Sequence, residues 1–162
     1  MHLKTKPQRR RFRPVIAAVL GVLIVAPLGV GPALAAEAPE IWQTDYKQAL
    51  AEAAQENKRV LLEFAGSDWC QPCIQMDKDV LSQPDFKKFA ASNLILVKLD
   101  FPRRKQLPPA EAEQNQKLQQ KYTIEGFPTY VLLDPSGKEV RRQLGYLKGG
   151  PTEFIKWVRV GN

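Results

Sequence analysis

The sequence predicts a single α/β domain in which a central mixed sheet of four strands is flanked by helices. In the first half of the domain, strand-like and helix-like segments alternate, which favours parallel strands. Near the C-terminus two strand-like segments flank the turn Pro135–Lys138, which predicts an antiparallel hairpin at the edge of the sheet. A chain of 162 residues suits one compact core better than two.

The individual elements follow from hydrophobic spacing and from turn residues. Alanine, glutamate and apolar residues at helical spacing predict a first helix behind a Thr44 or Asp45 cap. Continuous apolar runs bounded by turn residues predict buried strands. We expect strands at residues 60–65, 94–100, 129–134 and 139–144, and helices at 45–57, 72–81, 86–90, 110–121 and 152–158.

Residues 1–35 differ in composition from the rest of the chain. They begin with six basic residues and no acid, continue with an apolar run over 15–26, and end at Ala33-Leu34-Ala35-Ala36. This order predicts a secretory signal peptide cleaved after Ala35 or Ala36. An uncleaved membrane anchor is the alternative, although the run is shorter than the ~20 residues of a spanning helix. We expect a linker at 36–43 and the folded domain at 44–162.

The formal charge of +7 comes mostly from that leader, which holds six of the 24 basic residues and none of the 17 acidic ones. Without it, 18 basic residues face 17 acidic ones, so we do not expect the domain to bind nucleic acid. The one histidine, His2, is also in the leader. The mature protein therefore has no imidazole for catalysis or metal binding.

The chain has two cysteines, Cys70 and Cys73, separated by Gln71 and Pro72. A purely structural bridge is one alternative, but a disulfide stabilises a fold more when it closes a longer loop. Half of a zinc site is another, but structural zinc requires four ligands and no further cysteine is present. The pair is therefore predicted to be redox-active, with no metal and no other cofactor.

The position of the pair predicts its chemistry. Cys70 follows a strand and a short turn and precedes a helix whose first turn accommodates Pro72. Free N–H groups and the helix dipole favour thiolate at that position, which makes Cys70 the predicted nucleophile. Cys73, one turn later, would resolve a mixed disulfide formed on Cys70. Trp69, directly before the pair, is predicted to flank the site, with an ordinary core aromatic as the alternative.

Glu63 is a lone carboxylate in the apolar strand that precedes the cysteines. If it lies beneath the cysteines, burial should raise its pKa toward neutrality, and it could accept and return the proton of Cys73. A strand residue that faces solvent is the alternative.

Four features of the sequence resemble the thioredoxin superfamily. They are the stretch Trp69-Cys70-Gln71-Pro72-Cys73, Glu63 in the preceding strand, the stretch Gly126-Phe127-Pro128-Thr129, and the closing hairpin and helix. The resemblance covers residues 44–160. It implies the thioredoxin fold, a cis Phe127–Pro128 bond facing the disulfide, and a Phe127 backbone that binds substrate peptide beside Thr129.

The chain also departs from thioredoxin in two ways. It has Gln71-Pro72 in place of Gly-Pro, and it lacks the histidine that strongly oxidising relatives and disulfide isomerases carry there, which favours a reductant. The segment between Asp100 and Pro128 is about a dozen residues longer than in thioredoxin, and long loops are often functional. Residues 101–120 are therefore predicted to shape the choice of partner.

We expect an exported, periplasmic thiol-disulfide oxidoreductase that reduces protein disulfides as a monomer and is re-reduced by a membrane or periplasmic thiol donor. The alternatives are a disulfide oxidase or isomerase, a partner-binding module that kept the fold, and a metal carrier. Redox potential distinguishes reductase from oxidase, and no sequence pattern gives it.

Overall fold

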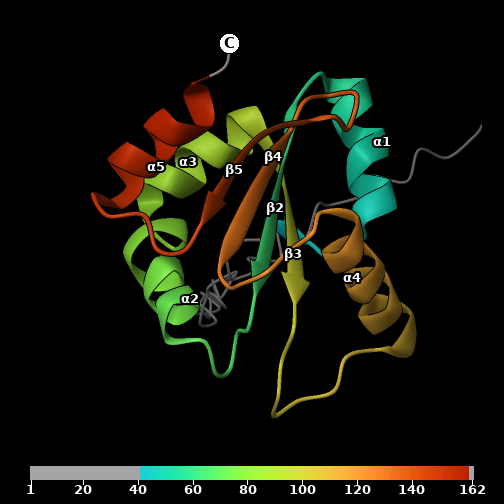
Figure 1. The fold of residues 1–162 in the computed structure, drawn as a ribbon. Helices are drawn as coiled ribbons and strands as arrows, with labels where there is room; N and C mark the ends of the chain where they lie inside the picture. The colour runs from blue at the N-terminus through green and yellow to red at the C-terminus, as the bar shows by residue number, and fades with distance from the viewer. Residues whose placement is uncertain (1–40, 161–162) are drawn as a thin grey trace, which may run out of the picture. The chain divides into compact units, whose positions relative to one another are not determined.

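The computed structural model describes residues 41–160 (Figure 1). The expected signal peptide or anchor, and most of the expected linker, lie outside the described residues. No described helix has the length and apolar character needed to cross a membrane. The elements are β1 (Trp42–Gln43), α1 (Tyr46–Glu56), β2 (Arg59–Ala65), α2 (Gln71–Met76), η1 (Asp77–Leu81), α3 (Pro84–Asn93), β3 (Leu94–Asp100), α4 (Pro109–Lys121), β4 (Thr129–Leu133), β5 (Glu139–Leu144) and α5 (Gly150–Arg159).

The sheet has five strands in the order β1-β3-β2-β4-β5. β2 pairs with β3 in parallel and with β4 antiparallel, and β4 and β5 form the predicted hairpin. The predicted count of four strands is therefore wrong by one. The additional strand, β1, pairs with Leu96 and Val97 of β3 and lies in the segment predicted to be linker. Two residues are too short to show a strand period, so the sequence carried no signal for it.

The alternation of side chains along the strands divides the core into two layers. From β2, Val60, Leu62 and Phe64 pack against α1 and α4, whereas Leu61 packs on the opposite face. That opposite face is covered by α2, α3 and α5 (Figure 1). Side chains with a period of two point to one face, so Glu63 lies on the same face as Leu61. This places the carboxylate on the α2 side of the sheet.

The helix predicted over residues 72–81 is present, but its second half is a π-helical turn, η1. The N–H of Ser82 donates to the carbonyl of Asp77, 2.8 Å away, five residues earlier. Gln83 and Pro84 then begin α3, as the predicted break after Leu81 requires. Single π turns have no sequence period of their own, and they occur often at functional sites.

Candidate active site

The two cysteines lie where β2 ends and α2 begins. Cys70 is the N-cap residue of α2 and forms a disulfide with Cys73, with their Cα atoms 5.3 Å apart. The carbonyl of Cys70 accepts hydrogen bonds from the N–H groups of Cys73 and Ile74. Both cysteines are nearly buried, at 4% and 3% exposure, and pack with Ala65. The structure thus holds the pair in its oxidised form, at the carboxyl end of a parallel strand.

The turn between β2 and Cys70 depends on Gly66 and Trp69. The carbonyl of Gly66 accepts hydrogen bonds from the N–H groups of Trp69 and Cys70. A Cβ atom at residue 66 would overlap the indole of Trp69, so only glycine allows the ring to fold over the turn. The indole N–H donates to the carbonyl of Phe101, 2.8 Å away, which fixes the orientation of the ring.

The aromatic rings of Trp69 and Phe127 pack against the cysteines. The two rings meet edge to face with their centroids 6.0 Å apart. Trp69 therefore packs on the cysteine cluster, and its flanking role stays a prediction. Of the residues between the cysteines, Gln71 is exposed and Pro72 lies in the first turn of α2.

The Phe127–Pro128 bond is cis, as the resemblance implied. Pro128 is buried, and its carbonyl accepts a hydrogen bond from the N–H of Gly145 at 2.8 Å. Thr129 begins β4, and its hydroxyl donates to the carbonyl of Gly126 at 2.7 Å. Hydrogen bonds thus hold the backbone of this segment, and its first residue, Phe127, packs on the cysteine cluster.

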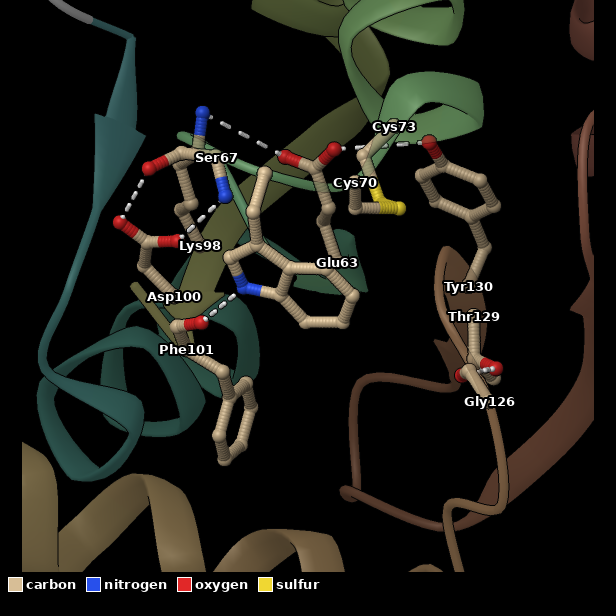
Figure 2. The surroundings of a disulfide bond; sticks show 11 residues. Glu63, Ser67, Cys70, Cys73, Lys98, Asp100, Phe101, Gly126, Thr129 and Tyr130 are labelled. Carbon is tan, nitrogen blue, oxygen red and sulfur yellow. Dashed lines mark hydrogen bonds and ion pairs between the residues drawn. A yellow bond between two sulfur atoms is a disulfide. The ribbon is translucent and has the colours of Figure 1, made fainter. Parts of the chain in front are cut away.

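Glu63 is buried, at 1% exposure, between two polar side chains of the neighbouring strands. Its strand partners in register are Lys98 on β3 and Tyr130 on β4. The Tyr130 hydroxyl donates to one carboxylate oxygen at 3.4 Å, and the Lys98 ammonium lies 3.9 Å from the other (Figure 2). Burial raises the pKa of Glu63 to about 7, and the charge of Lys98 opposes that rise.

Glu63 and Cys73 share a cavity of about 120 Å³, also lined by Lys98 and Asp77. The carboxylate oxygen that faces Lys98 accepts no hydrogen bond from the protein. A cavity of this size with several polar groups can hold water. Glu63 and Cys73 therefore border the same small polar cavity.

Sequence reasoning identified Glu63 but missed Lys98, Tyr130 and Asp77. Lys98 carried the same signal as Glu63, because it is a lone charge inside an apolar strand. Pairing the two charges required the strand register, which the sequence does not give. Asp77 was not identified because it begins the π turn η1, which the sequence did not predict. Tyr130 was not identified because its sequence position is that of an ordinary core aromatic.

Within residues 41–160, no group of three or more His, Cys, Asp or Glu side chains is placed to hold a metal ion. The redox centre of the described domain is the disulfide itself.

A mixed sheet of this topology, with a Cys-x-x-Cys disulfide at the start of a helix and a cis-proline that follows Phe127 of the cysteine cluster, defines the thiol-disulfide oxidoreductases of the thioredoxin fold. A family model described as thioredoxin-like matches residues 41–135. The disulfide bond reductase DsbH of Chlamydia pneumoniae is 36% identical over 118 residues, which cover 73% of this chain and 70% of that protein.

A solved structure of a DsbH oxidoreductase superposes with a TM-score of 0.69 at 34% identity, covering 80% of this chain and 92% of that one. The thiol:disulfide interchange protein DsbD 2 of Pseudomonas aeruginosa is 31% identical over 103 residues, covering 62% of this chain and 16% of that protein. The chain belongs to the thioredoxin-like family and is a thiol-disulfide oxidoreductase, which confirms the fold class and the class of activity predicted from the sequence.

The burial of Glu63 predicts an unusual dependence of stability on pH. Because its folded pKa of about 7 exceeds the ordinary value of 4.5, its protonated form is favoured in the folded protein. The contribution to stability is complete below the unfolded pKa and is lost as pH rises through the folded one. A rise of this size corresponds to about 3 kcal/mol.

Glu63→Gln should remove this dependence and be more stable than the natural protein at about pH 8.5, while the two converge near pH 4. Urea unfolding of the oxidised proteins at both pH values measures the difference. Glu125→Gln, at an exposed site, is the control and should unfold like the natural protein. A Glu63→Gln protein that is less stable at the higher pH would show that the carboxylate stabilises the fold.

Proposed function

We propose that the protein is an exported, monomeric reductase of protein disulfides. The observation that carries the proposal is that Cys73 and Glu63 open onto one cavity, while Cys70 occupies the start of α2. Such an arrangement supplies a nucleophile, a resolving thiol and a group that exchanges its proton near neutral pH.

In the first step, the thiolate of reduced Cys70 attacks one sulfur of a substrate disulfide. A mixed disulfide forms on Cys70, the substrate bond breaks, and the second substrate sulfur leaves as a thiolate that takes a proton from water. In the second step, the Cys73 thiolate attacks the sulfur of Cys70. The Cys70–Cys73 bond forms, the mixed disulfide breaks, and the substrate leaves with two electrons and two thiols.

Glu63 prepares Cys73 for the second step. A thiol is a poor nucleophile, and its usual pKa lies above neutrality. With a pKa of about 7, Glu63 is ionised in a large fraction of molecules at neutral pH and can accept the Cys73 proton through water in the shared cavity. When a dithiol donor re-reduces the disulfide, the same carboxyl returns the proton.

The substrate chain lies along the Phe127–Thr129 segment. Two hydrogen bonds hold this backbone in place: the Gly145 N–H donates to the Pro128 carbonyl, and the Thr129 hydroxyl donates to the Gly126 carbonyl. Phe127 itself packs on the cysteine cluster. An extended peptide can add to such a segment as a strand, with its disulfide directed at Cys70.

The proposal also includes the direction of electron flow, the thiol donor and the location of the protein. The similar Chlamydia protein is named a disulfide bond reductase, and no histidine separates Cys70 from Cys73 to favour an oxidant. The basic and apolar leader supports export to the periplasm, by cleavage or with the leader kept as an anchor. A membrane or periplasmic thiol donor would then keep the pair reduced.

Single cysteine substitutions test the order of attack. Cys70→Ser should reduce protein disulfides no faster than dithiothreitol alone. Cys73→Ser should accumulate a mixed disulfide with the substrate, because the second thiol that releases it is missing. Rates of protein disulfide reduction and non-reducing gels measure these outcomes. Undiminished activity of Cys70→Ser would exclude the proposed function.

The pH dependence of the reaction tests Glu63. The pre-reduced natural protein should reduce a protein disulfide faster as pH rises, with a step near pH 7 where Glu63 ionises. Glu63→Gln should lose that step and react about tenfold to a hundredfold more slowly at neutral pH. Lys98→Met should move the step to higher pH, because the ammonium lowers the pKa of Glu63. A step that persists in Glu63→Gln would assign it to another group.

The redox potential tests the direction. The reduction potential of the Cys70/Cys73 pair, measured by equilibration with glutathione or dithiothreitol, should lie close to that of thioredoxin, which is about −270 mV. The potential of a strong oxidase is much higher, at about −120 mV. A value at the oxidising end would identify an oxidase or isomerase.

A further inference from the structure

Three consecutive cations, Arg103, Arg104 and Lys105, follow β3 and lie beside the active-site turn. All three are exposed. The reaction described above uses none of them. Their position beside the cysteines results from specific hydrogen bonds.

Asp68, in the turn before Cys70, fixes the first two cations. Its two carboxylate oxygens accept the backbone N–H groups of Arg103 at 3.0 Å and Arg104 at 2.8 Å. These bonds hold the pKa of Asp68 below its usual range, so the anchor stays ionised. The indole of Trp69 adds its hydrogen bond to Phe101. The loop is thus tied at three points to the turn that carries Cys70.

A second anchor lies beneath the first and involves Asp100 at the end of β3. Asp100 accepts the backbone N–H of Ser67 at 2.9 Å and its hydroxyl at 2.7 Å (Figure 2). It also forms an ion pair of 2.9 Å with Lys105. The charge of Lys105 is therefore paired with that of Asp100.

The two arginine side chains differ from Lys105. Within residues 41–160, neither guanidinium lies within ion-pair distance of a carboxylate. The nearest anchor, Asp68, is occupied by backbone N–H groups. We call Arg103 and Arg104 the basic rim.

Within the basic rim, Arg103 is linked to the cysteine cluster through Trp69. The guanidinium carbon of Arg103 lies 3.7 Å from the centroid of the Trp69 ring. The same ring packs against Cys70 and Cys73. One aromatic side chain therefore contacts both the disulfide cluster and a cation. An arginine stacked in this way keeps its N–H groups available for a carboxylate.

We propose that the basic rim selects acidic substrates, so that disulfides flanked by aspartate or glutamate react faster than neutral ones. The proposal rests on the disulfide reductase activity proposed above. Charges at the edge of a binding site act mainly on the rate of association and are screened by salt. Since residues 36–162 carry 18 basic and 17 acidic residues, the net charge of the domain supplies no such preference, and we assign it to this local pair.

The test uses two synthetic peptides that share one disulfide, with four glutamates around it in one and four glutamines in the other. The pre-reduced full-length protein is mixed with each peptide, and the second-order rate constant is measured. The acidic peptide should react about tenfold faster at low ionic strength, and the ratio should fall toward one in high salt. Taking a ratio removes any change in the intrinsic reactivity of the cysteines.

Four double variants show which residues cause the preference. Arg103→Glu/Arg104→Glu should bring the ratio to one or below, and Arg103→Lys/Arg104→Lys should largely keep it. Lys87→Glu/Lys88→Glu removes two exposed cations from α3 and is the matched control, with the ratio expected to stay as in the natural protein. All variants share residues 1–40, so the basic leader contributes equally to each. Arg103→Gln/Arg104→Gln, expected to give a ratio near one, replaces the charge reversal if that variant does not fold.

Each outcome decides one proposal. A protein that reduces neither peptide contradicts the reductase function. Two outcomes would overturn the selection of acidic substrates without contradicting the reductase function. One is equal rates with both peptides, and the other is a preference that persists when the basic rim is removed. Equal peptide rates together with rim-dependent binding to phosphatidylglycerol vesicles would assign the arginines to a lipid surface instead.

Discussion

Glu63 occupies the central strand of the sheet, and its burial is the constraint on which the site depends. A carboxylate in that position has a strand on either side and a helix above it, so bulk solvent cannot reach it to stabilise its charge. Its neighbours in register, Lys98 and Tyr130, lower this cost without removing it. The part of the burial cost that they do not offset raises the pKa of Glu63 to about 7. A fully paired carboxylate would hold its charge more strongly and would accept a thiol proton less readily.

The same register explains why Cys73, and not Cys70, faces the carboxyl group. Side chains of β2 alternate, and Glu63 lies on the face that α2 covers. Cys73 is in the first turn of α2 and lines the cavity with Glu63, whereas Cys70 packs at its start beside Trp69 and Phe127. In the proposed mechanism, Cys70 therefore reacts with the substrate and Cys73 exchanges a proton with Glu63. The two proposed roles follow from the positions of β2 and α2.

Much of this arrangement was predictable from the residues. The four longer strands, the helix after the cysteines and the buried acid follow from apolar runs broken by single polar residues. The cis bond before Pro128 came from family resemblance, because cis is a minority state of X-Pro bonds in general. The pairing of Glu63 with Lys98 did not follow, since it needs the order and register of strands far apart in the sequence. Strand β1 and the π turn η1 were too short to leave a pattern.

The basic rim arises from the same parallel pairing that builds the catalytic centre. β2 and β3 run side by side and end at one edge of the sheet, at Ala65 and Asp100. The chain after each strand must therefore pass close to the other, and Ser67, Asp68 and Trp69 bond to residues 100–104. A loop that follows β3 in this fold thus becomes part of the wall around the cysteines. In the proposed mechanism, the charge of this loop acts on the choice of substrate, whereas the cavity shared by Glu63 and Cys73 is lined by none of the residues 101–105.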